Sequence, residues 1–223
     1  MSIGKLKNKG TLANQAYDTL KESIIKLDLK PGQLIFEETL SDELGISRTP
    51  LRAALQRLTY EGFIINSTGK GSIVKELSIK DFIELSEVRE SLELLCIKLA
   101  AAKRSKEDVQ LLKKTMNKQI QITHNNPLNT KEFLKTDSEV HLIIADMAKN
   151  IVLKMILIQL KERYDRYLFY TRFTERTTTV VDEHLSIVDA IESGDETKAQ
   201  NIMKIHLDGV RDSVKETLIS NHL

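Results

Sequence analysis

The sequence predicts a mainly α-helical protein in two parts: three short helices with a small β-hairpin, then an all-α bundle. Two observations indicate this division. Seven of the nine glycines lie before residue 72, and no proline follows residue 127, so turns are concentrated early in the chain. After about residue 77, apolar residues recur at helical spacing with few breaks. We therefore expect one domain over residues 1–77 and another over residues 78–223.

The composition favours a soluble protein. Hydrophobic residues make up 41% of the 223 residues and charged residues 29%. No apolar run approaches the roughly 20 residues that cross a bilayer, and no apolar segment follows the lysines near the N-terminus. The single cysteine, Cys96, lies in an apolar run and is expected to be buried rather than reactive. A cytoplasmic protein with no membrane partner fits these features.

Turn residues separate the elements of the first part. Pro31 and Gly32 mark a turn after the first helix, and Gly45 and Gly62 end the second and third helices. Pro50 suits the first turn of the third helix. The expected elements are helices over residues 13–27, 37–44 and 48–61, and strands over residues 63–65 and 72–74, joined by a hairpin tip over residues 67–71.

Two helices joined by a tight turn, followed by a hairpin, indicate a winged helix-turn-helix. Arg48 and Arg52 lie four residues apart and so share one face of the third helix, where arginine can contact guanine. Thr49 can reach a phosphate or a thymine methyl group, and Gly69 and Lys70 at the hairpin tip can approach a minor groove. Residues 44–75 hold five basic residues and one acidic residue, a local charge of +4. The alternative is a helical surface with scattered arginines.

The sequence predicts six helices in the second part. Ser78 with Asp81, and Ser105 with Asp108, form capping boxes that begin the first two, and Asp195 caps the last. The expected helices cover residues 78–103, 105–125, 131–149, 151–172, 178–193 and 195–218.

Three histidines occupy regular positions in these helices. Asp137 and His141 share one helix face, and His184 and His206 lie among apolar residues of two others. One carboxylate and three imidazoles at a common point would suit a divalent first-row metal ion. The alternative is that each histidine is an ordinary core residue bonded to the backbone. His124 is expected to be solvated.

The run from Gly45 to Leu58, with Glu61 and Gly62, closely resembles the signature of the GntR family of transcription regulators. The resemblance implies that Arg48, Thr49, Arg52, Arg57 and Gly69 contact operator DNA. Some members carry a basic residue where this chain has Glu38, and a carboxylate there would repel phosphate. That contact is therefore expected to be absent or altered.

Residues 85–93 look like the opening helix of the FCD effector domain of the FadR subfamily. Asp137, His141, His184 and His206 match the metal-binding pattern of that domain, with Asn150 between them. The resemblance implies a bound metal, with zinc expected first and nickel or manganese as alternatives. It also implies that Arg89 faces the effector pocket, where it would hold a carboxylate beside Asn150; the alternative is a surface salt bridge with Glu93.

These features together predict a homodimeric DNA-binding regulator, not an enzyme, that represses transcription until a small organic acid binds. Two recognition helices would read a palindromic operator in double-stranded DNA. Two alternatives remain: a metal-dependent hydrolase, and a regulator whose metal is purely structural.

Overall fold

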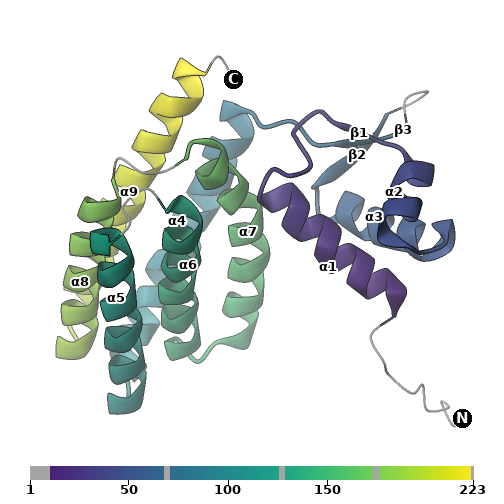
Figure 1. Cartoon of the computed structure of the whole chain (residues 1–223). Helices are drawn as coiled ribbons and strands as arrows, with labels where there is room; N and C mark the ends of the chain where they lie inside the picture. The colour runs from purple at the N-terminus through teal and green to yellow at the C-terminus, as the bar shows by residue number, and fades with distance from the viewer. Residues whose placement is uncertain (1–10, 68–70, 126–128, 173–175, 222–223) are drawn as a thin grey trace, which may run out of the picture. The chain divides into compact units, whose positions relative to one another are not determined.

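A computed structural model describes residues 11–67, 71–125, 129–172 and 176–221. The chain divides into two compact units, Met1–Glu76 and Leu77–Leu223. The described residues are mainly helical, with one small antiparallel sheet in the first unit (Figure 1). The mainly α fold class, with a winged helix-turn-helix followed by a helical bundle, is confirmed.

The first unit packs three helices around one apolar core. Its elements are α1 (Leu12–Ile25), β1 (Leu34–Ile35), α2 (Glu37–Leu44), α3 (Arg48–Tyr60), β2 (Ile64–Ser67) and β3 (Gly71–Val74). Leu20, Ile24, Leu51 and Leu58 are buried between α1 and α3. The turn between α2 and α3 uses Gly45 at φ 63°, a left-handed conformation that glycine adopts without strain.

The wing is a sheet of three strands in the order β1-β3-β2, with β3 antiparallel to both neighbours. The sequence predicted the β2–β3 hairpin but not β1. That strand is two residues long, with Leu34 paired to Ile73 and Ile35 to Ser72, so it has no alternation to detect. The hairpin tip, which contains Gly69 and Lys70, lies outside the described residues.

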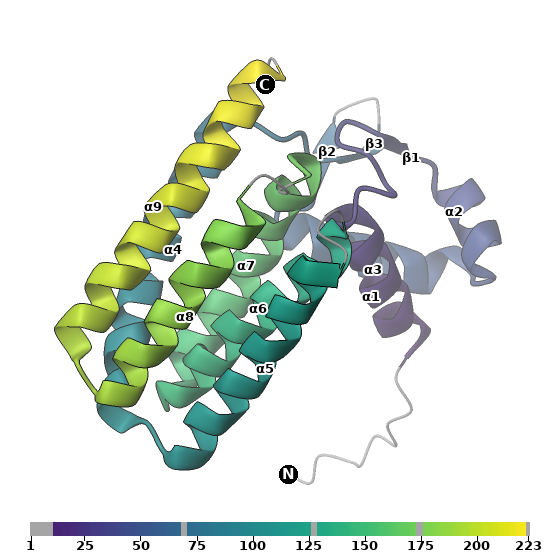
Figure 2. The same ribbon diagram turned by 60° about the vertical axis from the view of Figure 1, so that its left-hand side comes forward.

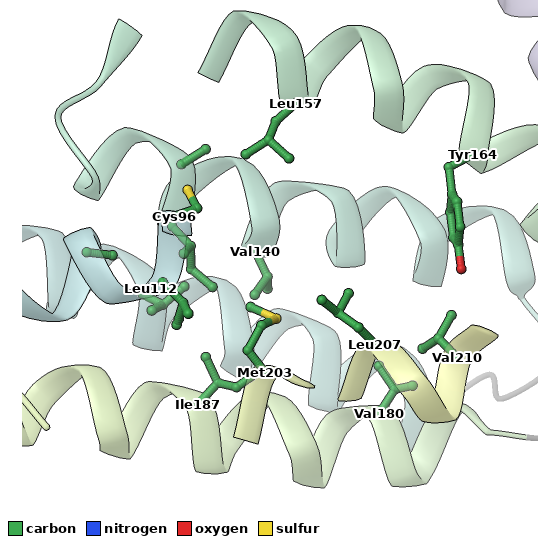
Figure 3. Close-up of a cluster of buried hydrophobic side chains, with 14 of the residues drawn as sticks. Cys96, Leu112, Val140, Leu157, Tyr164, Val180, Ile187, Met203, Leu207 and Val210 are labelled. Carbon is green, nitrogen blue, oxygen red and sulfur yellow. The ribbon is translucent and has the colours of Figure 1, made fainter. Parts of the chain in front are cut away.

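The described residues of the second unit form six helices that lie side by side (Figure 2), and α4 packs against four of the others. They are α4 (Ile79–Lys103), α5 (Lys106–Asn125), α6 (Thr130–Met147), α7 (Ile151–Tyr170), α8 (Thr177–Ser193) and α9 (Glu196–Ser220). Their core includes Leu112, Val140, Ile187 and Met203, from α5, α6, α8 and α9 (Figure 3). Cys96 is buried in it as expected, and burial raises the pKa of its thiol to about 12.

Side-chain caps begin several of these helices. Ser78 accepts a hydrogen bond from the Asp81 backbone N–H, and Asp195 accepts one from that of Lys198. The Asp81 carboxylate, which a capping box would use within its own helix, accepts instead from Tyr167 Oη at 3.0 Å. That hydrogen bond joins the start of α4 to the end of α7.

Candidate DNA-reading helix and metal centre

Helix α3 is amphipathic in the way that a recognition helix requires. Leu51, Leu55 and Leu58 are buried against the rest of the unit, while Arg48 and Thr49 in its first turn are exposed. Ser47, the N-cap, makes no side-chain capping bond. The first N–H groups of α3 are therefore not capped by that side chain, as suits a helix end that approaches phosphate or base edges.

Two arginines of this face pair with glutamates of α2. Arg48 Nη2 lies 3.1 Å from Glu38 Oε1, and Arg52 Nε donates to Glu37 Oε2 at 2.7 Å. Sequence reasoning flagged Glu38 as a repulsive charge but did not anticipate either ion pair. Both pairs are largely exposed, so each contributes at most about 1 kcal/mol and can open when phosphate competes.

Arg57 belongs to a cluster that joins α3 to α1. Its guanidinium lies 3.5 Å from the ring centroid of Tyr17, and its Nε donates to Glu61 at 3.2 Å. Glu61 also accepts from Tyr17 Oη and pairs with Lys21. Burial opposes ionisation of Glu61, but the hydrogen bonds from Lys21 and Tyr17 outweigh it and hold its pKa below the usual value. Arg57 therefore has a packing role, and its predicted DNA contact stays a prediction.

The second unit brings three histidines together. His141 comes from α6, His184 from α8 and His206 from α9, and one nitrogen of each lies within 4.8 Å of the others. All three side chains are buried. Such a set could hold a metal ion. His124, by contrast, is exposed, as expected.

Each of these imidazoles has its Nδ1 occupied by an outer partner. Glu93 accepts from His141 at 2.7 Å, Gln119 from His184 at 3.0 Å and Glu183 from His206 at 2.9 Å. With the proton on Nδ1, the Nε2 of each ring carries the lone pair. In His141 that atom lies 3.4 Å from Arg89 Nη2. The Nε2 of His184 is buried without a hydrogen-bond partner among the described residues. An orphaned acceptor of this kind, oriented by an outer hydrogen bond, is the arrangement of a metal-ligating histidine.

Burial keeps two of these rings, those of His184 and His206, neutral. Burial and the neighbouring His141 lower the pKa of His206 to about 3, and burial lowers that of His184 well below its usual value. Asp137 lies beside them, with its Oδ1 3.7 Å from His184 Nε2. Burial opposes its ionisation, but His141 and Lys161 prevail and bring its pKa to about 2. The cluster thus offers two neutral imidazoles, those of His184 and His206, and one ionised carboxylate, the protonation states that metal binding needs.

Arg89 is neither a surface residue nor free in a pocket. Its Nε donates to Glu93 at 2.9 Å, and both side chains are buried. Its Nη2 lies 3.4 Å from His141 Nε2, and its guanidinium stacks over the Tyr164 ring. The salt bridge with Glu93 therefore exists, but it is buried next to the histidines rather than on the surface, and the predicted contact of Arg89 with an effector stays a prediction.

A small cavity of about 10 Å³ lies beside this cluster, lined by Arg89, Glu93, His141, Leu142, Ala145, Leu157 and Lys161. That is about the space of one water molecule, so an organic acid cannot enter without movement of the walls. Lys161 is buried on the cavity and pairs with Asp165 at 2.8 Å. Asn150 caps α7, accepting from the Leu153 backbone N–H, and its predicted effector role stays a prediction.

Sequence reasoning missed four residues of this site: Glu93, Gln119, Lys161 and Glu183 have no assigned role in the predicted set. Glu93 was considered only as a surface partner of Arg89. Gln119 gave no signal, because its contact with His184 joins positions 65 residues apart.

Comparison with known proteins bears on both units. Residues 12–74 match the model of bacterial regulatory proteins of the gntR family, and residues 84–209 match the FCD domain. The HTH-type transcriptional regulator YcbG of Bacillus subtilis is 30% identical, over 93% of this chain and 91% of that protein. The HTH-type transcriptional repressor RspR of Escherichia coli is 23% identical, over 91% and 88%.

A solved structure, E. coli McbR/YncC, superposes with a TM-score of 0.81 at 20% identity, over 93% of this chain and 99% of that one. No helix among the described residues is long and apolar enough to cross a membrane. The two domain matches, in this order and with this fold, make the chain a DNA-binding transcriptional regulator of the GntR family that carries an FCD domain.

Proposed function

We propose that this regulator reads a palindromic operator as a homodimer, and that a small carboxylate bound at a metal site in its FCD domain changes its operator affinity. The observation that carries the proposal is the unpartnered, buried Nε2 of His184 within a set of three oriented imidazoles. Burying such an acceptor without a partner is costly, and a metal ion would satisfy it.

The proposed ligands are His141, His184 and His206, with Asp137 as the oxygen ligand. Zinc is the first candidate, with nickel and manganese as alternatives, because geometry and availability select the metal. When bound, a divalent metal would supply a Lewis-acidic anchor for a carboxylate. The outer partners Glu93, Gln119 and Glu183 would hold the imidazoles in the orientation that aims each Nε2 inward.

Elemental analysis of protein purified without a metal-affinity tag tests the site. We expect about one metal ion per chain in the wild-type protein, and its loss in His184→Ala. His124→Ala is the matched control, since His124 is exposed and lies outside the cluster. Equal metal content in all three proteins would contradict the ligand assignment, and no metal in any of them would contradict the metal site itself.

The effector is proposed to be a small carboxylate because two buried cations border the cavity. Arg89 offers a guanidinium fork, and Lys161 offers an ammonium group 3.8 Å from Asp137 Oδ2. A panel of small carboxylates, screened by thermal shift on metal-loaded protein, tests this. Arg89→Ala should abolish the stabilisation while leaving duplex DNA binding intact; an unchanged effector response would return Arg89 to a packing role.

One observation favours a second candidate, a purely structural metal. The cavity of about 10 Å³ is too small for an effector in this conformation. A structural metal predicts that chelation unfolds the helical domain while no small carboxylate shifts its melting temperature. A sensor site predicts that at least one carboxylate raises that temperature, and only when metal is present.

The proposed direction of control is repression that the effector relieves. RspR, a relative over most of the chain, is described as a repressor. Arg52 is proposed to read a base, so Arg52→Ala should cost roughly 1–3 kcal/mol of operator binding and relax base preference. Selection of binding sites from random duplexes measures both; an unchanged consensus would remove Arg52 from base reading. A reporter gene that is more active when the regulator is deleted would support repression.

A further inference from the structure

Helix α4 carries an exposed stripe on the side that faces away from the core. Its members are spaced alternately by four and three residues, and all are exposed: Glu84, Val88, Ser91, Leu95 and Lys98. This is the spacing of the seam of a coiled-coil helix. The bundle does not need these side chains, because α4 buries a different face, which includes Leu85, Arg89 and Cys96.

The stripe is apolar at its centre. Val88 is 49% exposed and Leu95 45% exposed, and the partly buried Leu92 and Leu99 border them. Exposed aliphatic side chains in a row on one helix mark an interaction surface more often than single ones do.

The neighbouring helix α7 extends this apolar face. Its Arg163 pairs with Asp81 of α4, which fixes the side of α7 that faces α4. Ile156 lies seven residues before Arg163, and Val152 lies four residues before Ile156, so both fall on that side. They are 45% and 63% exposed. The apolar surface therefore spans two packed helices rather than one.

The charges of the stripe identify its partner. It is acidic at Glu84, near the start of α4, and basic at Lys98, near its end. In an antiparallel pair of two α4 helices, Glu84 of one copy lies opposite Lys98 of the other, and Val88 lies opposite Leu95. Ser91 then lies opposite itself at the two-fold axis. A surface that complements its own copy in this way is what an isologous dimer requires. Among the described residues of one copy, the ion-pair partner of Glu84 is Lys80, which is exposed and 3.9 Å away.

We propose that two copies of this chain associate through the Glu84–Lys98 stripe of α4, antiparallel about a two-fold axis at Ser91, with Val152 and Ile156 of α7 at its edge. The interface rests on the proposed homodimer and gives that dimer a register. The partner is a second copy rather than an unrelated protein. When a second α4 runs antiparallel to the first, its basic end lies opposite the acidic end of the first, so the charges of the two stripes are complementary.

Charge reversal tests the register in the full-length protein by sedimentation velocity. The two-fold axis repeats each substitution, so Glu84→Lys or Lys98→Glu alone should raise the dimer dissociation constant about tenfold. The double variant should restore it. Lys114→Glu, on the exposed side of α5, is the matched control and should leave it unchanged. A dimer unaffected by either single reversal overturns this interface, whereas a monomeric wild type overturns the proposed homodimer itself.

Cross-linking tests the axis without relying on charge. Ser91→Cys places two thiols opposite each other, so mild oxidation should convert the dimer to a covalent one. Ser186→Cys is the matched control, since Ser186 is also an exposed helical serine that donates to the carbonyl four residues earlier. Native Cys96 is buried and should not contribute. Efficient cross-linking only at position 91 supports the register; equal yields at both positions, or none at 91, overturn it.

Discussion

Substitution of Glu38 by glutamine should tighten binding to duplex DNA. Glu38 Oε1 lies 3.1 Å from Nη2 of Arg48, a residue proposed to contact DNA, and both side chains are mostly exposed. An exposed pair of this kind contributes about 0–1 kcal/mol, and Arg48 must give it up to contact phosphate. Removing that cost predicts up to about fivefold tighter binding at low salt.

Fluorescence anisotropy with a generic duplex measures this effect, because phosphate contact needs no operator sequence. Glu43→Gln is the control: it removes the same charge from the exposed surface of the same helix, and Glu43 pairs with no arginine of α3 among the described residues. Glu38→Lys should also steepen the salt dependence, by about 0.9 in the log–log slope for one added phosphate contact. If Glu38→Gln binds no better than Glu43→Gln, the ion pair does not compete with DNA. Weaker binding would mean that Glu38 positions Arg48.

Three further predictions follow from single contacts. Glu37→Gln should relax base preference more than it changes overall affinity, because Glu37 fixes the Nε of Arg52 and leaves its two terminal nitrogens for a base; site selection from random duplexes compares the two effects. Gln119→Leu should weaken metal binding about 10- to 100-fold, since it removes the outer partner of His184; competition with a fluorescent chelator measures it, and unchanged affinity would contradict the orienting role. The pKa of Glu61 is lowered in the folded state, so its ionised form stabilises the fold at pH values above the unfolded-state pKa. This stabilisation is lost as the pH falls through the folded-state pKa. In chemical denaturation, the free energy of unfolding of the wild type should therefore fall more steeply below about pH 4.5 than that of Glu61→Gln.

Helix positions could be predicted from the sequence, but some helix ends could not, and three of the predicted helices ran two residues too far. The predicted helices ran to Leu27, Lys149 and Arg172, whereas α1, α6 and α7 end at Ile25, Met147 and Tyr170. Leu27, Lys149 and Arg172 are the three described non-glycine residues with positive φ. Each makes the left-handed turn that glycine usually makes. Glycine and proline predicted the helix ends at Gly45 and Gly194. They did not predict the ends near Leu27, Lys149 and Arg172, because these residue types give no sign of a left-handed conformation.

The candidate site divides in the same way. Helical spacing and neighbouring apolar residues placed His141, His184 and His206 on the buried faces of three helices, and packing brought them together. Their outer partners were not predictable, because a contact such as that between Glu93 and His141 depends on how α4 crosses α6. The pairing of Glu38 with Arg48 likewise depends on the angle between α2 and α3, which the turn at Gly45 sets.

Helix α4 connects the cavity to the proposed dimer interface, the Glu84–Lys98 stripe. Arg89 lines the cavity next to the histidines, whereas Val88, one residue earlier, is exposed on the stripe. A cavity of about 10 Å³ must enlarge to admit a carboxylate, and α4 supplies two of its lining residues, Arg89 and Glu93. Any movement of α4 that enlarges the cavity also moves the stripe, because a helix shifts as a rigid element. Linkage between two binding equilibria is reciprocal. If the effector changes the dimer dissociation constant by some factor, dimerisation changes the effector dissociation constant by the same factor. A variant that disrupts the α4 stripe, such as Leu95→Asp, should therefore change effector affinity by that factor. Equal effector affinity in monomer and dimer, measured by calorimetry, would show that α4 does not couple the two.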